Sequence, residues 1–252
     1  MHVVQGIEGL RPQLGPIFVV VGVFDGMHLG HAYLLEHLVS EAAAREARPT
    51  VITFDHHPDE ILMGTAPTLL LDPAERLERL EAAGVAITVV QHFDEALRHT
   101  PYDVFVERIR GRVGLTGFVM TPEAAFGFER RGTPATLAVL GARDGFDVVV
   151  VPPFTLDGRD VRSSAIRAAI VAGDIEVAAR LLGRPVTISG SIGGAVDGRA
   201  RLDFSLPVAL PPDGDYAVHV DGAPLALRIV RGDAYLLGEV SNRRVTVVFG
   251  AP

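Results

Sequence analysis

Two histidines three residues apart, His28 and His31, lie in the string G-V-F-D-G-M-H-L-G-H at residues 22–31. The string follows an apolar, β-branched run and precedes an amphipathic segment, which predicts a turn from a buried strand into a helix. The first amides of a helix and its positive dipole end favour phosphate. Imidazoles there can donate hydrogen bonds to phosphate oxygens as charge builds up during transfer. We predict nucleotidyl transfer, with His28 and His31 as catalytic residues.

The glycines of this string, Gly22, Gly26 and Gly30, allow the backbone to come close to a ligand. Two other interpretations of the histidines stay open. One is that a histidine caps the helix while the other lies at the surface. The other is a zinc site, although no further Asp, Glu or His group in the sequence has a recognised ligand spacing.

A second string, T-F-D-H-H-P at residues 53–58, follows the next apolar strand. Loops at the carboxyl ends of parallel strands face the ligand crevice. Asp55, His56 and His57 could therefore bind phosphate, ribose or an acceptor. The alternative is a polar turn closed by Pro58.

A third string, V-R-S-S-A-I-R at residues 161–167, predicts a helix start. Ser163 and Ser164 suit the N-cap and first turn, and Arg167 lies one turn later on the same face. Hydroxyls and a guanidinium there could hold phosphate. The alternative is a plain N-cap with a solvated arginine. All 23 basic residues are arginine, so a phosphate clamp here needs arginine, histidine or backbone amides.

Periodicity predicts alternating strands and helices up to residue 182. Strands are expected at 17–23, 50–54, 86–90, 117–120 and 147–151, and helices at 29–47, 73–83, 101–113, 136–144, 163–172 and 175–182. The strands are apolar on both faces, which is typical of a parallel sheet covered by helices. We predict an α/β fold with a doubly wound, Rossmann-like parallel sheet.

The pattern changes at residues 183–186. Short alternating segments at 186–192, 216–220, 226–230, 234–237 and 244–249 are separated by turns such as Asp221-Gly222. They predict a small antiparallel barrel or sheet. We expect two domains, residues 1–184 and 185–252.

Composition narrows the class of protein. Hydrophobic residues make up 48% of the 252, enough for a core, and a net charge of −8 argues against nucleic acid as a partner. The absence of cysteine excludes disulfides, thiolate zinc sites and cysteine nucleophiles, and fits a reducing cytoplasm. We see no signal peptide and no apolar run long enough for a membrane. We expect a cytoplasmic protein.

The three strings, in this order, resemble the adenylyltransferase domain of the bifunctional bacterial riboflavin kinase/FAD synthetases. The stretch A-G-D-I-E-V-A-A-R-L-L-G-R-P-V at residues 172–186 is similar to that family's domain junction. The resemblance covers about residues 16–190. It implies transfer of AMP from ATP to FMN, giving FAD and pyrophosphate, with Mg²⁺ as cofactor. It assigns no metal ligand in this chain.

The resemblance also implies roles for residues. The histidines of the first string, His28 and His31, contact the ATP phosphates. The nucleotide pocket is lined by Gly22, Phe24, Asp25, Gly26 and Gly30, and the triphosphate is held by Ser163, Ser164 and Arg167. The acceptor side is formed by Asp55, His57, Pro58, Glu123 and Phe126.

Three stretches depart from the family pattern. Where the family has G-x-[DN]-F-R-F-G, residues 121–127 read T-P-E-A-A-F-G, which removes stacking area and a phosphate donor. The family's S-S-T-x-I-R is Arg162-Ser163-Ser164-Ala165-Ile166-Arg167. The kinase string G-F-P-T-A-N aligns with D-F-S-L-P-V at residues 203–208, which lacks the threonine and asparagine oxygens. We therefore expect no riboflavin kinase activity and a shortened, degenerate kinase-like tail.

Three hypotheses follow. The first is an FMN adenylyltransferase without kinase activity. The second is a nucleotidyltransferase with another acceptor, suggested by residues 121–127. The third is a non-catalytic flavin or nucleotide sensor, suggested by the altered tail.

Overall fold

The computed structural model describes residues 1–196, 199–238, 240 and 243–250. The chain forms two compact units. The first, the sheet unit, consists of Met1–Phe24, Gly30–Pro67 and Leu77–Phe154. The second, the barrel unit, consists of Asp25–Leu29, Thr68–Arg76 and Thr155–Pro252. Two short internal segments thus pack with the C-terminal part of the chain.

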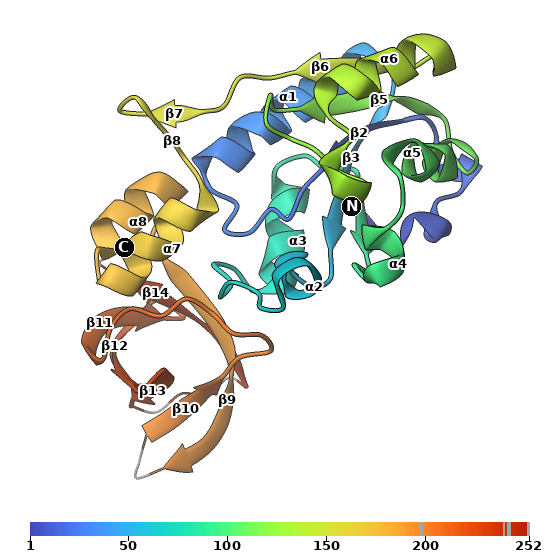
Figure 1. Ribbon diagram of the computed structural model, residues 1–252. Helices are drawn as coiled ribbons and strands as arrows, with labels where there is room; N and C mark the ends of the chain where they lie inside the picture. The colour runs from blue at the N-terminus through green and yellow to red at the C-terminus, as the bar shows by residue number, and fades with distance from the viewer. Residues whose placement is uncertain (197–198, 239, 241–242, 251–252) are drawn as a thin grey trace. The chain divides into compact units, whose positions relative to one another are not determined.

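The sheet unit is built on six parallel strands in the order β1-β4-β3-β2-β5-β6 (Figure 1). Their bounds are β1 (His2–Gln5), β2 (Ile17–Val21), β3 (Arg48–Phe54), β4 (Ile87–Gln91), β5 (Leu115–Met120) and β6 (Asp147–Val150). From β2 the chain continues to β3 and β4 on one side, and it later forms β5 and β6 on the other. The topological switch point therefore lies between β2 and β5, where such sheets bind nucleotides.

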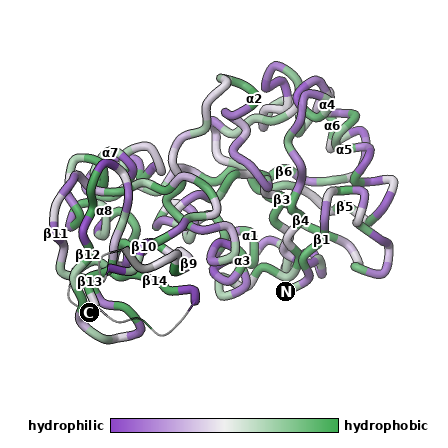
Figure 2. The backbone as a smooth tube through the Cα atoms, turned by 90° about the horizontal axis from the view of Figure 1, so that it is seen from below, coloured by the Kyte–Doolittle hydropathy of each residue, from purple (hydrophilic) through white to green (hydrophobic). Residues whose placement is uncertain are grey.

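Helices and short 3-10 turns connect these strands. They are η1 (Ile7–Gly9), η2 (Pro12–Leu14), α1 (Leu29–Ala44), α2 (Asp59–Met63), α3 (Pro73–Ala82), α4 (Glu95–Arg98), α5 (Tyr102–Arg110), η3 (Phe128–Arg130) and α6 (Pro134–Asp144). In Figure 2 the tube alternates between hydrophobic and hydrophilic along the helices, as expected for helices with one buried face. The helix α6 begins with a capping box between Thr133 and Thr136.

Alternation along the strands builds a core on each face of the sheet. On one face, strand residues such as Val19, Ile52 and Phe118 pack with apolar residues of α5 and α6 in one buried cluster. On the other face, the Arg45 guanidinium lies 4.7 Å from the centre of the Phe18 ring, just after α1 ends. Helices therefore cover both faces, and the predicted doubly wound α/β fold is confirmed.

The barrel unit contains a closed antiparallel barrel in the order β10-β13-β12-β11-β14-β9. Its strands are β9 (Thr187–Val196), β10 (Arg199–Asp203), β11 (Gly214–Val220), β12 (Ala223–Val230), β13 (Asp233–Leu237) and β14 (Arg244–Phe249). The two-stranded pair β7 (Thr155–Leu156) and β8 (Arg159–Asp160) and the helices α7 (Ser163–Ala172) and α8 (Ile175–Leu182) precede it. The predicted small barrel is confirmed. Closure matters because it leaves no unpaired strand edge.

Several predicted bounds were wrong, each for a local reason. The predicted strand 17–23 ends at Val21, because the backbone turns into left-handed conformation at Phe24, with a φ of 55°. The predicted helix 29–47 ends at Ala44, because the chain reverses at Glu46, with a φ of 51°, to enter β3. The parallel edge strand β1 and the strand β10 were missed. The edge strand β6 is not buried on both faces, since Asp147 and Val150 are exposed.

Candidate nucleotidyl transfer site

The turn after β2 is conformationally strained. Phe24 and Met27 have φ angles of 55° and 41°, which residues other than glycine rarely adopt. Gly26 lies between them with a φ of 84°, and a Cβ atom there would lie 2.9 Å from Cδ1 of Leu70. Strain of this kind costs of the order of 1–3 kcal/mol and collects at functional sites. Packing around the turn must therefore hold it in place.

Within the barrel unit, Asp25 makes contacts that hold this turn in place. Its carboxylate accepts a hydrogen bond of 2.8 Å from the Leu70 amide and forms an ion pair of 2.8 Å with Arg167. Its carbonyl accepts a hydrogen bond of 2.8 Å from the Ser163 hydroxyl. Arg167 also donates to the Thr68 carbonyl at 2.6 Å. The turn is thereby tied to the start of α7 and to residues 68–70.

His28 is buried in this unit, with 5% of its surface exposed. Burial, and then the positive charge of Arg184, lower its pKa to about 4. His28 is therefore neutral at pH 7. A neutral imidazole has one N–H group and can donate a hydrogen bond to a phosphate oxygen without carrying a charge of its own.

Arg184 is the cation beside the turn. Its guanidinium donates to the carbonyls of Gly26 at 2.7 Å and Met27 at 3.2 Å. The sequence pattern places Arg184 only in the domain junction, and its contact with the turn was not predicted. The signal was the arginine of the string L-G-R-P-V, the junction that resembles the family.

Other predicted site residues near the turn belong to the sheet unit. The His31 ring, in the first turn of α1, lies 5.0 Å from the ring of Phe24. The Thr53 hydroxyl donates to the Val23 carbonyl at 3.0 Å. A Cβ at Gly22 would lie 3.0 Å from Cε2 of Phe24, so only glycine leaves room for that ring. Gly30, like His31, lies in the first turn of α1.

The predicted phosphate grip at α7 is organised differently from the expectation. Ser163 and Ser164 are the first residues of α7, and the N-cap position is Arg162, which makes no side-chain cap. The predicted N-cap is therefore wrong by one residue, whereas the predicted position of the serines in the first turn is confirmed. Ser163 and Arg167 bind Asp25, while Ser164 is exposed. Residues 163 and 167 thus fix the turn, and only the Ser164 side chain points outward.

Residues 68–76 link the same turn to the barrel. Beyond the contacts of Thr68 and Leu70, the Asp72 carboxylate accepts from Arg244 at 2.5 Å and from Ser205 at 3.3 Å. Glu75 accepts from the hydroxyls of Thr187 and Ser189 at 3.3 and 3.0 Å. Leu69 pairs by its backbone with residues 207 and 209. One short segment therefore contacts Asp25 at one end and the barrel at the other.

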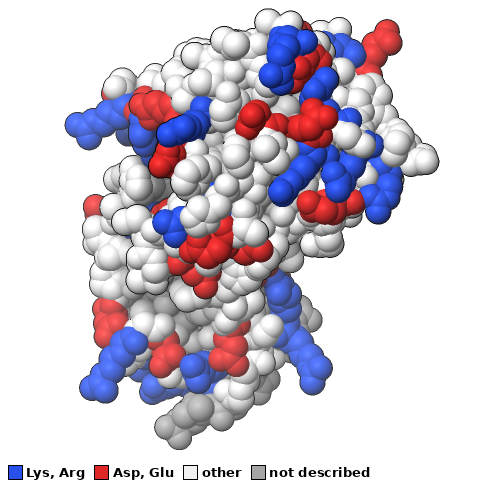
Figure 3. Space-filling view, turned by 45° about the vertical axis from the view of Figure 1, so that its right-hand side comes forward, with Lys and Arg blue, Asp and Glu red and all other residues white. Residues whose placement is uncertain are grey.

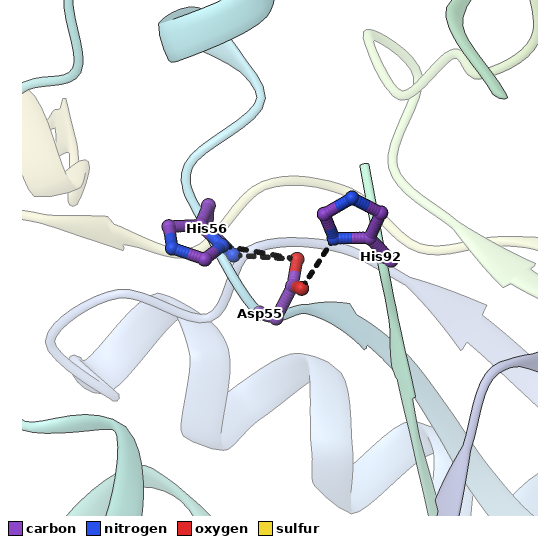
Figure 4. A group of neighbouring side chains, drawn as sticks. All are labelled: Asp55, His56 and His92. Atoms are coloured by element: carbon purple, nitrogen blue, oxygen red, sulfur yellow. Dashed lines mark hydrogen bonds and ion pairs between the residues drawn. The ribbon is translucent and has the colours of Figure 1, made fainter. Parts of the chain in front are cut away.

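At the carboxyl ends of β3 and β4, in the sheet unit, Asp55 lies between two histidines (Figure 4). His92 Nδ1 is 2.6 Å from Asp55 Oδ2, and His56 Nδ1 is 3.5 Å from Asp55 Oδ1. Burial raises the pKa of Asp55, but hydrogen bonds from His92 and the His56 amide outweigh it, and the pKa lies below its usual value. The same bond from Asp55 raises the pKa of His92. The sequence analysis missed His92.

The other predicted acceptor residues lie in two places. His57 Nδ1 accepts a hydrogen bond of 3.2 Å from the Asp59 amide, and Pro58 is the N-cap residue of α2. The string T-F-D-H-H-P therefore ends in a helix start that was not predicted. After β5, Glu123 is exposed, whereas the partly buried Phe126 ring lies 5.5 Å from the Phe105 ring and packs against the core.

Comparison with known proteins decides the family. Residues 11–165, more than half of the chain, match the FAD synthetase family. The chain belongs to the FAD synthetase family. Membership confirms the resemblance and the predicted class of enzyme, a nucleotidyltransferase.

Two curated relatives of this FAD synthetase family member are bifunctional riboflavin kinase/FMN adenylyltransferases. The protein of Haemophilus influenzae is 31% identical over 194 residues, which cover 76% of this chain and 63% of the relative. The protein of Pseudomonas fluorescens is 30% identical over 277 residues, which cover 99% of this chain and 88% of the relative.

A solved structure shares the fold. The crystal structure of a macrolide-efflux protein from Streptococcus pneumoniae matches with a TM-score of 0.78 and 21% identity, over 98% of this chain and 88% of that one. At this identity the likeness concerns the fold alone.

Magnesium was the predicted cofactor. Mg²⁺ prefers oxygen ligands and is usually held by one or two carboxylates, waters and substrate phosphates. In the turn, the Asp25 carboxylate is already bound by Arg167 and Leu70. Among the described residues, the one converging group of three or more His, Cys, Asp or Glu ligands contains two imidazoles, which do not suit Mg²⁺. The described side chains therefore offer no protein cage for Mg²⁺.

On the face shown in Figure 3, arginine and acidic side chains are interspersed over the described residues, without one broad basic surface. Within the described part of the chain, no helix is both long and apolar enough to span a membrane.

Proposed function

We propose that this chain is an FMN adenylyltransferase. An oxygen of the FMN phosphate attacks the α-phosphorus of ATP, the bond to the β-phosphate oxygen breaks, and FAD and pyrophosphate are the products. Family membership supports ATP and FMN as the substrates. The observation that carries the proposal is the neutral, buried His28 in a strained turn that leads into α1.

The chain's own residues would act by charge stabilisation and positioning. His28 would donate its N–H group to a phosphate oxygen whose charge increases during transfer, with Arg184 and the first amides of α1 adding positive potential. His31 would be the second donor. Asp25, Ser163 and Arg167 would act as positioning residues, since each is engaged in holding the turn. Ser164, exposed at the start of α7, would contact the triphosphate.

The acceptor would lie near the carboxyl ends of the strands, as in other doubly wound sheets. Asp55, His57 and Pro58 follow β3, and Glu123 and Phe126 follow β5, the strand across the switch point. Phe126, which is partly buried and packs against the core, would shape this region. Mg²⁺ and a cytoplasmic location remain predictions.

We further propose that the barrel supports this reaction and lacks kinase activity. The stretch at residues 203–208, which replaces the kinase string, is used differently here. Ser205 donates to Asp72, and the Pro207 carbonyl accepts from the Leu69 amide at 2.8 Å. Its polar groups hold residues 68–72, which in turn hold Asp25. We also propose that the nucleotidyltransferase domain comprises residues 1–184 and the kinase-like domain residues 185–252.

The test is an assay of the purified chain with FMN, ATP and Mg²⁺, in parallel with riboflavin, ATP and Mg²⁺, with flavins separated by chromatography. We expect FAD in the first reaction and no FMN in the second. If a folded preparation makes no FAD, the proposal is wrong. FMN formed from riboflavin would refute only the part that concerns the barrel.

A second candidate function is transfer of AMP to an acceptor other than FMN. The residues that favour it are Ala124 and Ala125, which stand where the family has an aromatic residue and an arginine. This alternative predicts that ATP binds and FMN does not. Saturable FMN binding, followed by quenching of flavin fluorescence, would exclude it. A non-catalytic sensor is separated from both by the effect of His28→Ala on rate.

A further inference from the structure

We propose that Asp55, His56 and His92 form a binding site for a divalent transition-metal ion such as Zn²⁺ or Co²⁺. The proposal does not depend on the proposed function. It rests on the convergence of three ligand side chains at one edge of the sheet. Within the described part of the chain, no other group of three or more His, Cys, Asp or Glu side chains brings its ligand atoms together in this way.

The sheet explains why these residues meet. Phe54 at the end of β3 pairs in parallel register with Gln91 at the end of β4. The next residue on each strand, Asp55 and His92, therefore emerges side by side at the carboxyl edge. His56 follows Asp55 directly, and Figure 4 shows both imidazoles directed toward the Asp55 carboxylate. Their positions depend on strand pairing, which is rigid, and not on a long loop.

The distances suit a small ion after limited movement. The three ligand atoms lie within 4.8 Å of one another. With bonds of about 2.0–2.1 Å, a tetrahedral ion separates its ligands by about 3.3 Å. His56 Nδ1 is 3.5 Å from Asp55 Oδ1 and His92 Nδ1 is 2.6 Å from Asp55 Oδ2, so each imidazole faces a different oxygen of the carboxylate. Ligand atoms that lie within 4.8 Å of one another must shift by up to about 1.5 Å to surround one ion. Rotation of exposed side chains provides this without moving the strands.

The chemistry of the donors selects the class of metal. Two imidazoles and one carboxylate suit Zn²⁺, Co²⁺, Ni²⁺ or Cu²⁺, whereas Mg²⁺ and Ca²⁺ prefer oxygen ligands alone. Three protein ligands leave a fourth position for water or for an anionic oxygen of a ligand. The site can take such a ligand because the side chains of His56 and His92 are 47% and 65% exposed.

Cobalt is the probe of choice, because its visible absorption reports a low coordination number and nitrogen ligands. The full chain, without affinity tag and treated with chelator, is titrated with Co²⁺, and Zn²⁺ is then added in competition. The absence of cysteine removes any thiolate background. We expect one Co²⁺ per chain with visible d–d absorption, displaced by Zn²⁺ and not by Mg²⁺.

Variants locate the site. His56→Ala and His92→Ala should each weaken Co²⁺ binding by at least about tenfold, the scale of losing even a supporting contact in a metal site, and the double variant should abolish it. His99→Ala is the matched control, because the His99 imidazole lies 3.4 Å from Glu95 and is as exposed as His92 but lacks a third ligand. It should leave binding unchanged.

Three results would overturn the proposal. The first is a chain that binds no Co²⁺. The second is binding that His56→Ala and His92→Ala both leave intact. The third is displacement of Co²⁺ by Mg²⁺ at equal concentration. Circular dichroism confirms that each variant is folded, and because His56 and His92 lie on different strand ends, either variant tests the site if the other fails to fold.

Discussion

His28 and His92 differ in protonation because their surroundings differ in burial and in charge. His28, in the barrel unit, is buried beside the Arg184 cation, and its pKa falls to about 4. His92, in the sheet unit, is exposed beside the Asp55 carboxylate, and its pKa rises. The first is thereby kept neutral as a hydrogen-bond donor, and the second is favoured in its charged form, which pairs with Asp55. Burial and the sign of the nearest charge, and not residue type, decide which chemistry a histidine offers.

The carboxylates of the same two regions, Asp25 and Asp55, differ in burial as well. Asp25 is buried and depends on Arg167, whereas Asp55 is partly exposed and can exchange its partners for water. Breaking the first pair leaves an uncompensated charge in the interior, while breaking the second does not. The turn should therefore be sensitive to substitution, and the edge of β3 and β4 tolerant.

The largest effect is expected for Arg167→Ala. It should lower the free energy of unfolding by roughly 3–5 kcal/mol, because Asp25 remains charged and buried without its cation. His92→Ala, which removes the exposed partner of Asp55, should cost clearly less. Urea unfolding of the two variants and the parent chain measures both. Equal losses of unfolding free energy in the two variants would show that the turn and the edge of β3 and β4 do not differ in sensitivity.

The second prediction concerns pH. The unfolded state protonates His28 near pH 6.5 and the folded state only near pH 4, so the unfolded state binds more protons between these values. The contribution of the neutral His28 to the free energy of unfolding is therefore fully present above pH 6.5. It is lost as the pH falls toward 4, by roughly 3 kcal/mol in all. His28→Gln should remove this slope from unfolding curves measured at a series of pH values.

For the exposed His92, the stability contribution changes with pH in the opposite direction. The folded-state pKa of His92 is raised, so its contribution is fully present below pH 6.5 and is lost as pH rises through the folded pKa. Proton NMR of the two imidazoles in chelator-treated protein reports each pKa directly. A His28 midpoint above that of His92 would contradict the account.

The third prediction concerns the shape of the turn. Gly26→Ala should cost roughly 2 kcal/mol, since alanine meets both a φ of 84° and the Leu70 side chain 2.9 Å away. Gly64→Ala is the matched control after α2, with a φ of 75° and open space around the added Cβ. Thermal unfolding should show the smaller loss at Gly64, and a larger loss there would show that contact with Leu70 is unimportant.

The smallest effect is expected at the barrel. Arg244→Ala should cost about 1 kcal/mol, because Asp72 keeps its hydrogen bonds from Ser205 and the Ala74 amide. If residues 68–76 transmit the support of the barrel to Asp25, the variant should also slow FAD synthesis severalfold. Arg228→Ala breaks an exposed pair with Asp215 and should change neither quantity. Equal rates for the two variants would refute this support.

Local signals in the sequence predicted much of the fold. The bounds of α7 and α8 were correct, because Gly173, with a φ of 85°, ends one helix and Asp174 precedes the next. The edge strand β1 was missed because a strand of four residues carries too little periodicity. The strand β10 was missed because its pattern is largely polar.

The candidate site was only partly predictable. His28, Asp25 and Ser163 could be found because their strings are local, but the contacts among them could not. Arg184 near His28 and His92 near Asp55 were missed, because chain folding and not spacing brings these pairs together. The serines of α7 were assigned to the helix start and to phosphate, because the sequence does not reveal that the Ser163 hydroxyl donates to the Asp25 carbonyl.

In the proposed reaction, the neutral His28 stabilises charge during AMP transfer. The direct measurement is the rate of FAD formation by His28→Ala at saturating ATP and FMN, beside His2→Ala, which removes an exposed histidine of β1. We predict a loss of about two or more orders of magnitude in kcat for His28→Ala, with ATP affinity little changed, and none for His2→Ala. A folded His28→Ala variant that keeps the parent kcat would contradict the account.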